Sequence, residues 1–129
     1  MKSILIYEST DELPMRSYVS PIMQVFSKLT NPPDYFHLDC FSDPSFFEWA
    51  TQFIAKNPDC LIILTFESGQ CIDGLSKVLN QVMQNNQGHM IVSLNTCMLL
   101  EKLKQKIPVS FFNSNGPFIQ HIKEKLIEV

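Results

Sequence analysis

Short apolar runs of strand length alternate with longer segments of helical period along this chain, and this alternation limits the folds open to it. Three of the runs are nearly continuous in apolar residues, which is typical of strands covered by helices on both faces of a parallel sheet. Five segments are predicted as strands: Ser3–Tyr7, Tyr35–Asp39, Cys60–Phe66, Met90–Leu94 and Val109–Phe112.

The segments between these runs carry apolar residues at spacings of three and four, which predicts amphipathic helices. The first lies between Met15 and Leu29, where Pro21 either restarts the helix or kinks it. The second begins at Asp43-Pro44, and Asn57-Pro58 ends it. Three more are predicted: Ile72 to Met83, a helix opening near Asn95-Thr96 with Met98 to Leu103, and one after Gly116-Pro117 with Phe118 to Leu126.

Strands separated by amphipathic helices favour a parallel sheet with right-handed crossovers. A chain of 129 residues has room for one core of this kind. We therefore expect a single α/β domain over residues 1–129, a small doubly wound, mostly parallel sheet of four to five strands flanked by helices. In such a sheet, ligands bind outside the carboxyl ends of the strands.

Charge and hydropathy exclude several classes of partner. The 10 Lys and Arg against 13 Asp and Glu give a net charge of −3, with no basic cluster to attract nucleic acid or an anionic membrane. No apolar run approaches the roughly 20 residues that cross a bilayer. Glu8 comes too early for a signal peptide. We expect a cytoplasmic protein without nucleic-acid or membrane partners.

The cysteines and histidines form no metal motif. Cys40, Cys60, Cys71 and Cys97 are widely scattered, without a C-x-x-C pair. The three histidines, including His37, form neither a triad nor a ligand set. We expect no bound metal and no cofactor.

Polar residues follow the predicted strands, and these are the candidates for a site. Glu8, Ser9, Thr10 and Glu67 are the candidates for chemistry, and Ser68, Gly69, Asn95 and Thr96 are those for binding. Each also has a purely structural explanation, because helix caps and turns need the same residue types.

A receiver domain of the response-regulator kind carries its chemistry on residues at the same strand ends. It needs paired acids after the first strand, an acceptor Asp ending the third and a Lys ending the fifth. Glu8, Asp11 and Glu12 imitate the acids, but the third strand ends in Phe66-Glu67 and residues 109–114 contain no Lys. Aspartyl-phosphate chemistry therefore lacks its acceptor and its cation.

A second pattern spans the third strand onward. Leu61–Gly69 is followed by a helix and then by Gly88–Leu103, in which Asn95, Met98 and Leu99 open another helix. This block resembles the IIA component of the mannose-type sugar phosphotransferase system, where an Asn-Leu-Pro-Met-Leu segment follows the fourth strand. The resemblance covers about residues 41–103 and the first strand.

The resemblance implies a phosphoryl carrier of sugar uptake, with phosphotransferase components as partners. Its accepting His belongs in the loop after the first strand, but residues 7–13 contain none, and Phe66 or Glu67 replaces the orienting Asp. The resemblance therefore predicts a carrier degenerate at its phosphohistidine, with a regulatory or partner-binding function. The alternative is a small-molecule or metal-binding module, flavodoxin-like or receiver-like and without catalysis, using Glu8, Asp11, Glu67 and Asn95.

The aromatic residues predict self-association. Phe46-Phe47, Trp49, Phe111-Phe112 and Phe118 exceed what one small core covers. A homodimer would bury the surplus, and members of the family that the chain resembles pair through the sheet edge and its last strand.

Overall fold

The five-stranded sheet is parallel throughout. The computed structural model describes residues 3–9, 22, 24–25, 28, 34–39, 43–57, 59–66, 73–84, 88–95 and 98–127. The strands are β1 (Ser3–Ser9), β2 (Asp34–Asp39), β3 (Cys60–Phe66), β4 (Met90–Leu94) and β5 (Val109–Phe112), and their order in the sheet is β2-β1-β3-β4-β5. The predicted α/β fold class is confirmed, with all five strands parallel.

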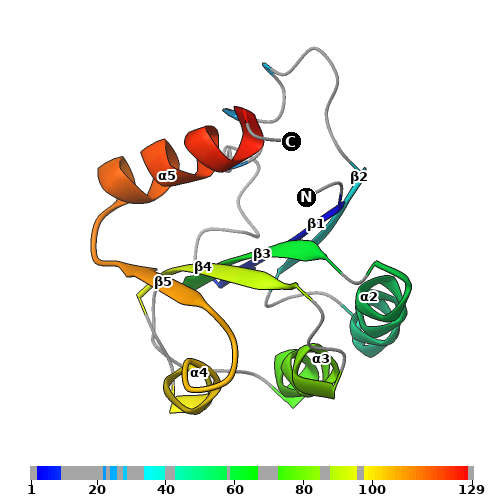
Figure 1. Ribbon diagram of the computed structural model, residues 1–129. Helices are drawn as coiled ribbons and strands as arrows, with labels where there is room; N and C mark the ends of the chain where they lie inside the picture. The colour runs from blue at the N-terminus through cyan, green and yellow to red at the C-terminus, as the bar shows by residue number, and fades with distance from the viewer. Residues whose placement is uncertain are drawn as a thin grey trace.

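Helices cover both faces of the sheet. Those with defined bounds are α2 (Pro44–Lys56), α3 (Asp73–Gln84), α4 (Met98–Leu103) and α5 (Asn115–Ile127). Figure 1 shows α2, α3 and α4 below one face and α5 above the other. The predicted helix between Met15 and Leu29 lies largely outside the described residues, although Ile22, Gln24 and Val25 are helical.

One helix boundary differs from the sequence prediction. The last helix was expected to follow Gly116-Pro117, but α5 already begins at Asn115. Proline is tolerated in the first turn because the amide hydrogen that it lacks would have no partner there. Gly116 and Pro117 therefore belong to the first turn of α5.

The alternation of side chains along the strands builds two core layers. One contains Leu5 and Tyr7 of β1 and packs against Phe47, Ala50 and Leu79 of the α2–α3 layer. The other packs against α5 and contains, among others, Ile4, Ile6, Leu61, Ile63, Val92, Phe118 and Ile122. Because β1 and β3 are buried on both faces, they appear as continuous apolar runs in the sequence.

None of the described helices is long and apolar enough to cross a membrane.

The strand order places a topological switch between β1 and β3. The connection from β1 leads to β2 on one side, and the chain then passes to β3 on the other side of β1. This is the flavodoxin-like order, in which ligands occupy the crevice at the carboxyl ends of the two strands where the order reverses. The fold therefore selects the ends of β1 and β3 as the candidate site.

A buried thiol lies at the opposite edge of the sheet, at the start of β3. The Cys60 amide donates a hydrogen bond to Nδ1 of His89 at 3.1 Å, and both residues are buried. Burial raises the pKa of the Cys60 thiol from 9.0 to about 12. The unfolded thiol therefore ionises at a lower pH than the folded one.

This difference predicts a loss of stability in alkali. The contribution of the protonated Cys60 thiol is intact below pH 9.0 and is lost as the pH rises toward about 12. Between about pH 8 and pH 10, the free energy of unfolding of the native chain should fall by about 1 kcal/mol more than that of Cys60→Ala. Urea denaturation of both proteins measures this, and equal pH dependence would contradict it.

Candidate functional site

The carboxyl ends of three strands lie side by side at the switch point. In the sheet register, Glu8 of β1 is level with Asp39 of β2 and with Thr65 of β3. Because neighbouring strands lie about 4.8 Å apart, these residues form one short row across the edge of the sheet. Side chains in this row that point to the same face are close enough to bind one ligand.

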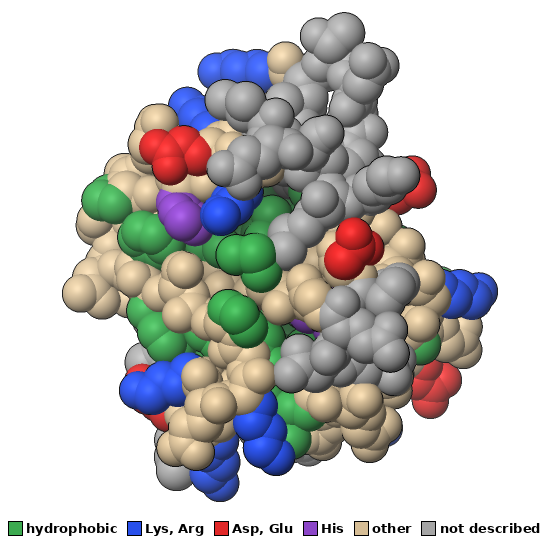
Figure 2. Space-filling model, viewed as in Figure 1, with side chains coloured by type: hydrophobic (Ala, Val, Ile, Leu, Met, Phe, Trp, Pro, Cys, Tyr) green, Lys and Arg blue, Asp and Glu red, His purple; other side chains and the backbone are tan. Residues whose placement is uncertain are grey.

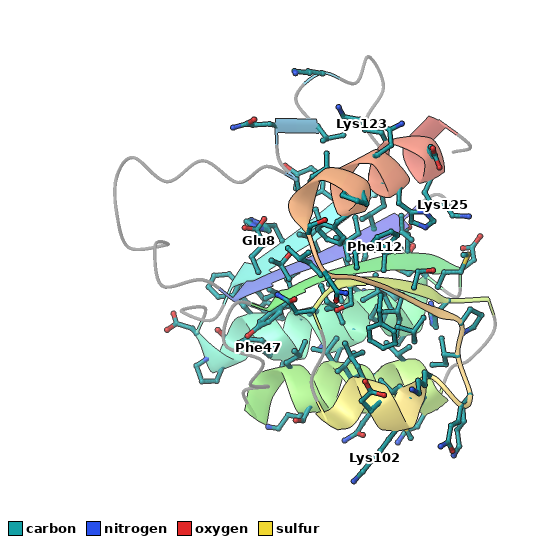
Figure 3. The ribbon with its side chains drawn as sticks, turned by 90° about the vertical axis from the view of Figure 1, so that its left-hand side faces the viewer. Glu8, Phe47, Lys102, Phe112, Lys123 and Lys125 are labelled. Carbon is teal, nitrogen blue, oxygen red and sulfur yellow. The ribbon has the colours of Figure 1, made fainter. Side chains whose placement is uncertain are left out.

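Glu8 is a buried carboxylate, with only 2% of its surface exposed. It follows Ile4 and Ile6 on the α5 face of β1. Figure 3 shows Glu8 on this side of the sheet, whereas Phe47 of α2 lies on the other side. Its Oε1 lies 3.4 Å from Nε2 of His37 in β2. A buried carboxylate is costly unless it is paired, and the imidazole is close enough to form an ion pair with it when protonated.

Thr65 completes the group on the same face. It is next to Glu8 in register and follows Ile63, which belongs to the core layer under α5. Its Oγ1 is buried and has no hydrogen-bond partner within the part of the chain that the structure describes. A buried hydroxyl without a partner is uncommon, and a ligand at this edge could satisfy it.

Asn95 has a structural function at the end of β4. Its φ of 66° lies in the left-handed region, which Asn adopts more readily than most residues. Its amide donates to the Phe112 carbonyl at 2.8 Å, and its own carbonyl accepts a 2.7 Å hydrogen bond from the Ser93 hydroxyl. These contacts hold the turn that leads toward α4. Binding through the Asn95 side chain remains a prediction.

The remaining sequence candidates are only partly placed. Ser9 is the last residue of β1, but its side chain is not described. The others lie outside the described residues: Thr10, Glu67, Ser68, Gly69 and Thr96. The structure instead brings Glu8 together with His37 and Thr65, two residues that the sequence did not single out. Strand alternation places both on the face of Glu8, but only the strand order makes them neighbours.

Basic side chains lie away from this group. Lys102, Lys104 and Lys106 are exposed on α4 and the turn after it, where Figure 2 shows lysine side chains gathered, and Lys104 pairs with Glu101 at 2.7 Å. In Figure 3, Lys102 points away from the sheet on the side opposite to Glu8, and Lys125 lies toward the far end of α5. These four lysines therefore give the Glu8 edge no positive charge.

The described residues also contain no group of three His, Cys, Asp or Glu side chains that could hold a metal ion. Asp11 and Glu67, which the metal-binding alternative requires beside Glu8, lie outside the described residues. Glu8 itself is in contact with an imidazole.

No family model and no curated protein matches the chain. Among solved structures, it is similar to the signal receiver domain of a Luxo repressor protein from Vibrio parahaemolyticus. The identity is 20%, the TM-score is 0.48, and the match covers 99% of this chain and 98% of that chain.

The predicted membership of the mannose-type phosphotransferase IIA family is wrong. No family model supports it, and a solved structure that the chain resembles is a receiver domain. The predicted link to sugar transport and to phosphotransferase partners depended on this membership and is therefore also wrong. The physical reason is visible at Asn95, whose left-handed backbone and hydrogen bonds to Phe112 and Ser93 give it a structural function. Asn adopts this conformation in turns of many kinds.

Proposed function

We propose that this protein is a receiver-like α/β binding module without catalysis, which binds a small polar molecule at the carboxyl ends of β1 and β3. One observation carries the proposal: Glu8, His37 and Thr65 lie on one face of the sheet at its switch point, and the Thr65 hydroxyl is buried without a partner in the described part of the chain. Crevices at such switch points are the usual ligand sites of doubly wound sheets.

The chemistry of the group favours a neutral ligand rich in hydroxyls, such as a nucleoside or a sugar. Glu8 accepts hydrogen bonds, and a hydroxyl such as that of Thr65 both donates and accepts. The sequences of β1, β2 and β3 contain no Lys or Arg, so a phosphate would meet the Glu8 carboxylate without a compensating cation from these strands. A ligand hydroxyl can satisfy both groups at once.

Binding without phosphoryl transfer agrees with the strand ends. β3 ends at Phe66, which Glu67 follows, and β5 is followed by Asn113, so neither an acceptor Asp nor a Lys is present where a receiver needs them. In this proposal, the loops around the ligand contain the remaining candidates: Ser9, Thr10, Glu67, Ser68, Gly69, Asn95 and Thr96.

The proposal also includes the localisation and the partners of the protein. It acts in the cytoplasm as one domain that pairs with a second copy or another protein.

Thermal unfolding with added ligands tests the proposal. Adenosine, glucose, ATP, Mg²⁺ and Ca²⁺ serve as probes, because a ligand selective for the native state raises its stability by mass action. At about ten times its Kd, a ligand should raise Tm by about 5 °C. We expect adenosine or glucose to do so. The absence of a shift with both, or a shift with a metal ion alone, would contradict the proposal.

A threonine pair provides the matched variants. Thr65→Val removes the buried hydroxyl, so it should stabilise the free protein by about 1 kcal/mol and abolish the shift caused by the ligand. Thr51→Val in α2 removes a hydroxyl that donates to the Phe47 carbonyl at 2.9 Å. It should destabilise the protein by about 1 kcal/mol and leave the ligand shift intact. A ligand shift that persists in Thr65→Val would overturn the assignment of the site.

A further inference from the structure

Helix α2 carries two apolar stripes: the first is buried in the core, and the second adjoins that core only through Phe53. Phe47, Ala50 and Ile54 are buried against the sheet and α3. A second stripe, which we call the aromatic stripe, consists of Phe46, Trp49 and Phe53 at spacings of three and four residues. Surface helices of globular proteins usually present a polar face to water.

The aromatic stripe is substantially exposed. Phe46 is 39% exposed and Trp49 is 51% exposed, and their rings meet edge to face with centroids 5.2 Å apart. Phe53 is half-buried, and its ring centroid lies 5.9 Å from that of Phe36 in β2. Each ring of the stripe therefore packs against another aromatic ring before any partner binds, which reduces the entropy that association would cost.

The position of α2 leaves this flank accessible. In Figure 1, α2 is the end helix of the layer formed with α3 and α4, and α3 lies on its inner side. Contiguous exposed aromatic side chains in this setting indicate an interaction surface.

We propose that two copies of the chain pair through the aromatic stripe, with their α2 helices antiparallel about a two-fold axis. The stripe is centred between Trp49 and Ala50, and the helix from Pro44 to Lys56 is centred on Ala50. An antiparallel pair in which facing residue numbers sum to 99 therefore covers both stripes fully. In this register Phe46 faces Phe53 of the second copy, and the two Trp49 rings flank the axis.

Charge complementarity at the helix ends favours this arrangement. Asp43 precedes α2, Lys56 lies in its last turn, and both are exposed. The same antiparallel register places each Asp43 beside Lys56 of the second copy. A parallel pair would place like charges together at both ends, which is destabilising.

The size of the stripe indicates a weak dimer. Three partly exposed aromatic side chains from each copy bury a few hundred Å², well below the roughly 1,200 Å² of a stable interface. Trp is nevertheless among the residues that dominate binding energy. We therefore expect a dimer that forms as the concentration approaches roughly 1 mM and dissociates at roughly 10 µM. This inference rests on the pairing with a second copy proposed above and does not depend on the ligand site.

Sedimentation equilibrium between about 10 µM and 1 mM tests the surface. Trp49→Ala should weaken dimerisation by about 30-fold, because it removes the residue next to the axis. Tyr35→Ala is the matched control, since Tyr35 is 45% exposed on β2, outside the aromatic stripe, and the proposed surface does not include it. Its loss should leave dimerisation unchanged.

Two results would overturn the inference in different ways. A native chain that stays monomeric throughout this range would show that no second copy pairs with it, and the stripe would then bind a different protein or another segment of this chain. A dimer that survives Trp49→Ala but is lost in Tyr35→Ala would retain the pairing and move it to the edge strand. Neither result bears on the ligand site.

A charge exchange tests the antiparallel register itself. Asp43→Lys and Lys56→Asp should each weaken the dimer about threefold to tenfold, because each places like charges together at both ends of the helix pair. The double variant should restore most of the native affinity. The Asp43 side chain caps no amide of α2, so its replacement removes no capping hydrogen bond. Failure of the double variant to restore dimerisation would overturn the register.

Discussion

A free energy of unfolding lower by about 3–5 kcal/mol is expected when Phe118 is replaced by alanine. Phe118 is buried between α5 and the sheet, and its ring centroid lies 6.1 Å from that of Phe112 in β5. It belongs to the core layer that contains Ile6 and Ile63. Truncation removes the apolar surface of the ring and leaves a cavity that a packed sheet cannot close. Urea denaturation measures the loss, and the dependence of the free energy of unfolding on urea concentration should not change.

A position two residues further along α5 provides the control for this variant. Gln120 lies on the same helix and is exposed, so Gln120→Ala should change the free energy of unfolding by less than about 0.5 kcal/mol. Small domains have about 5–15 kcal/mol of stability in total, so Phe118→Ala should remove a large share of it. A loss below about 1 kcal/mol would contradict the packing of α5 on this face.

The strands could be predicted from the sequence because their signal is local. All five were expected, and the bounds of β3, β4 and β5 agree with the structure. β1 continues two residues beyond the expected end at Tyr7, to Ser9. The added Glu8 is polar yet buried, so the apolar pattern gave no sign that the strand included it.

The aromatic surplus was predictable only in part. Composition indicated more aromatic side chains than one core needs, but not which ones would remain outside. The structure buries Phe47 and Phe118, and it leaves Phe46 and Trp49 exposed on α2. The division depends on which flank of α2 faces α3, and this is a property of the assembled layer.

The contact of Glu8 with His37 could not be predicted because it joins residues 29 positions apart, on strands whose adjacency the sequence does not reveal. The order of strands in a doubly wound sheet follows from how the crossovers pack, and short-range patterns do not encode it. Loop residues such as Asn95 were easier to anticipate, because turn and cap preferences act within a few residues.

A double-mutant cycle should show that this contact between strands β1 and β2 stabilises the fold. His37→Ala is expected to lower the free energy of unfolding by about 2 kcal/mol, because the buried Glu8 carboxylate then loses one of its partners. In a Glu8→Gln background the same change should cost less than about 1 kcal/mol, since the neutral amide is cheaper to bury. Tyr35→Ala, on the same strand and face as His37, should cost the same in both backgrounds within about 0.5 kcal/mol. If His37→Ala also costs the same in both, the imidazole does not stabilise the carboxylate, and the polar group at the switch point loses its central contact.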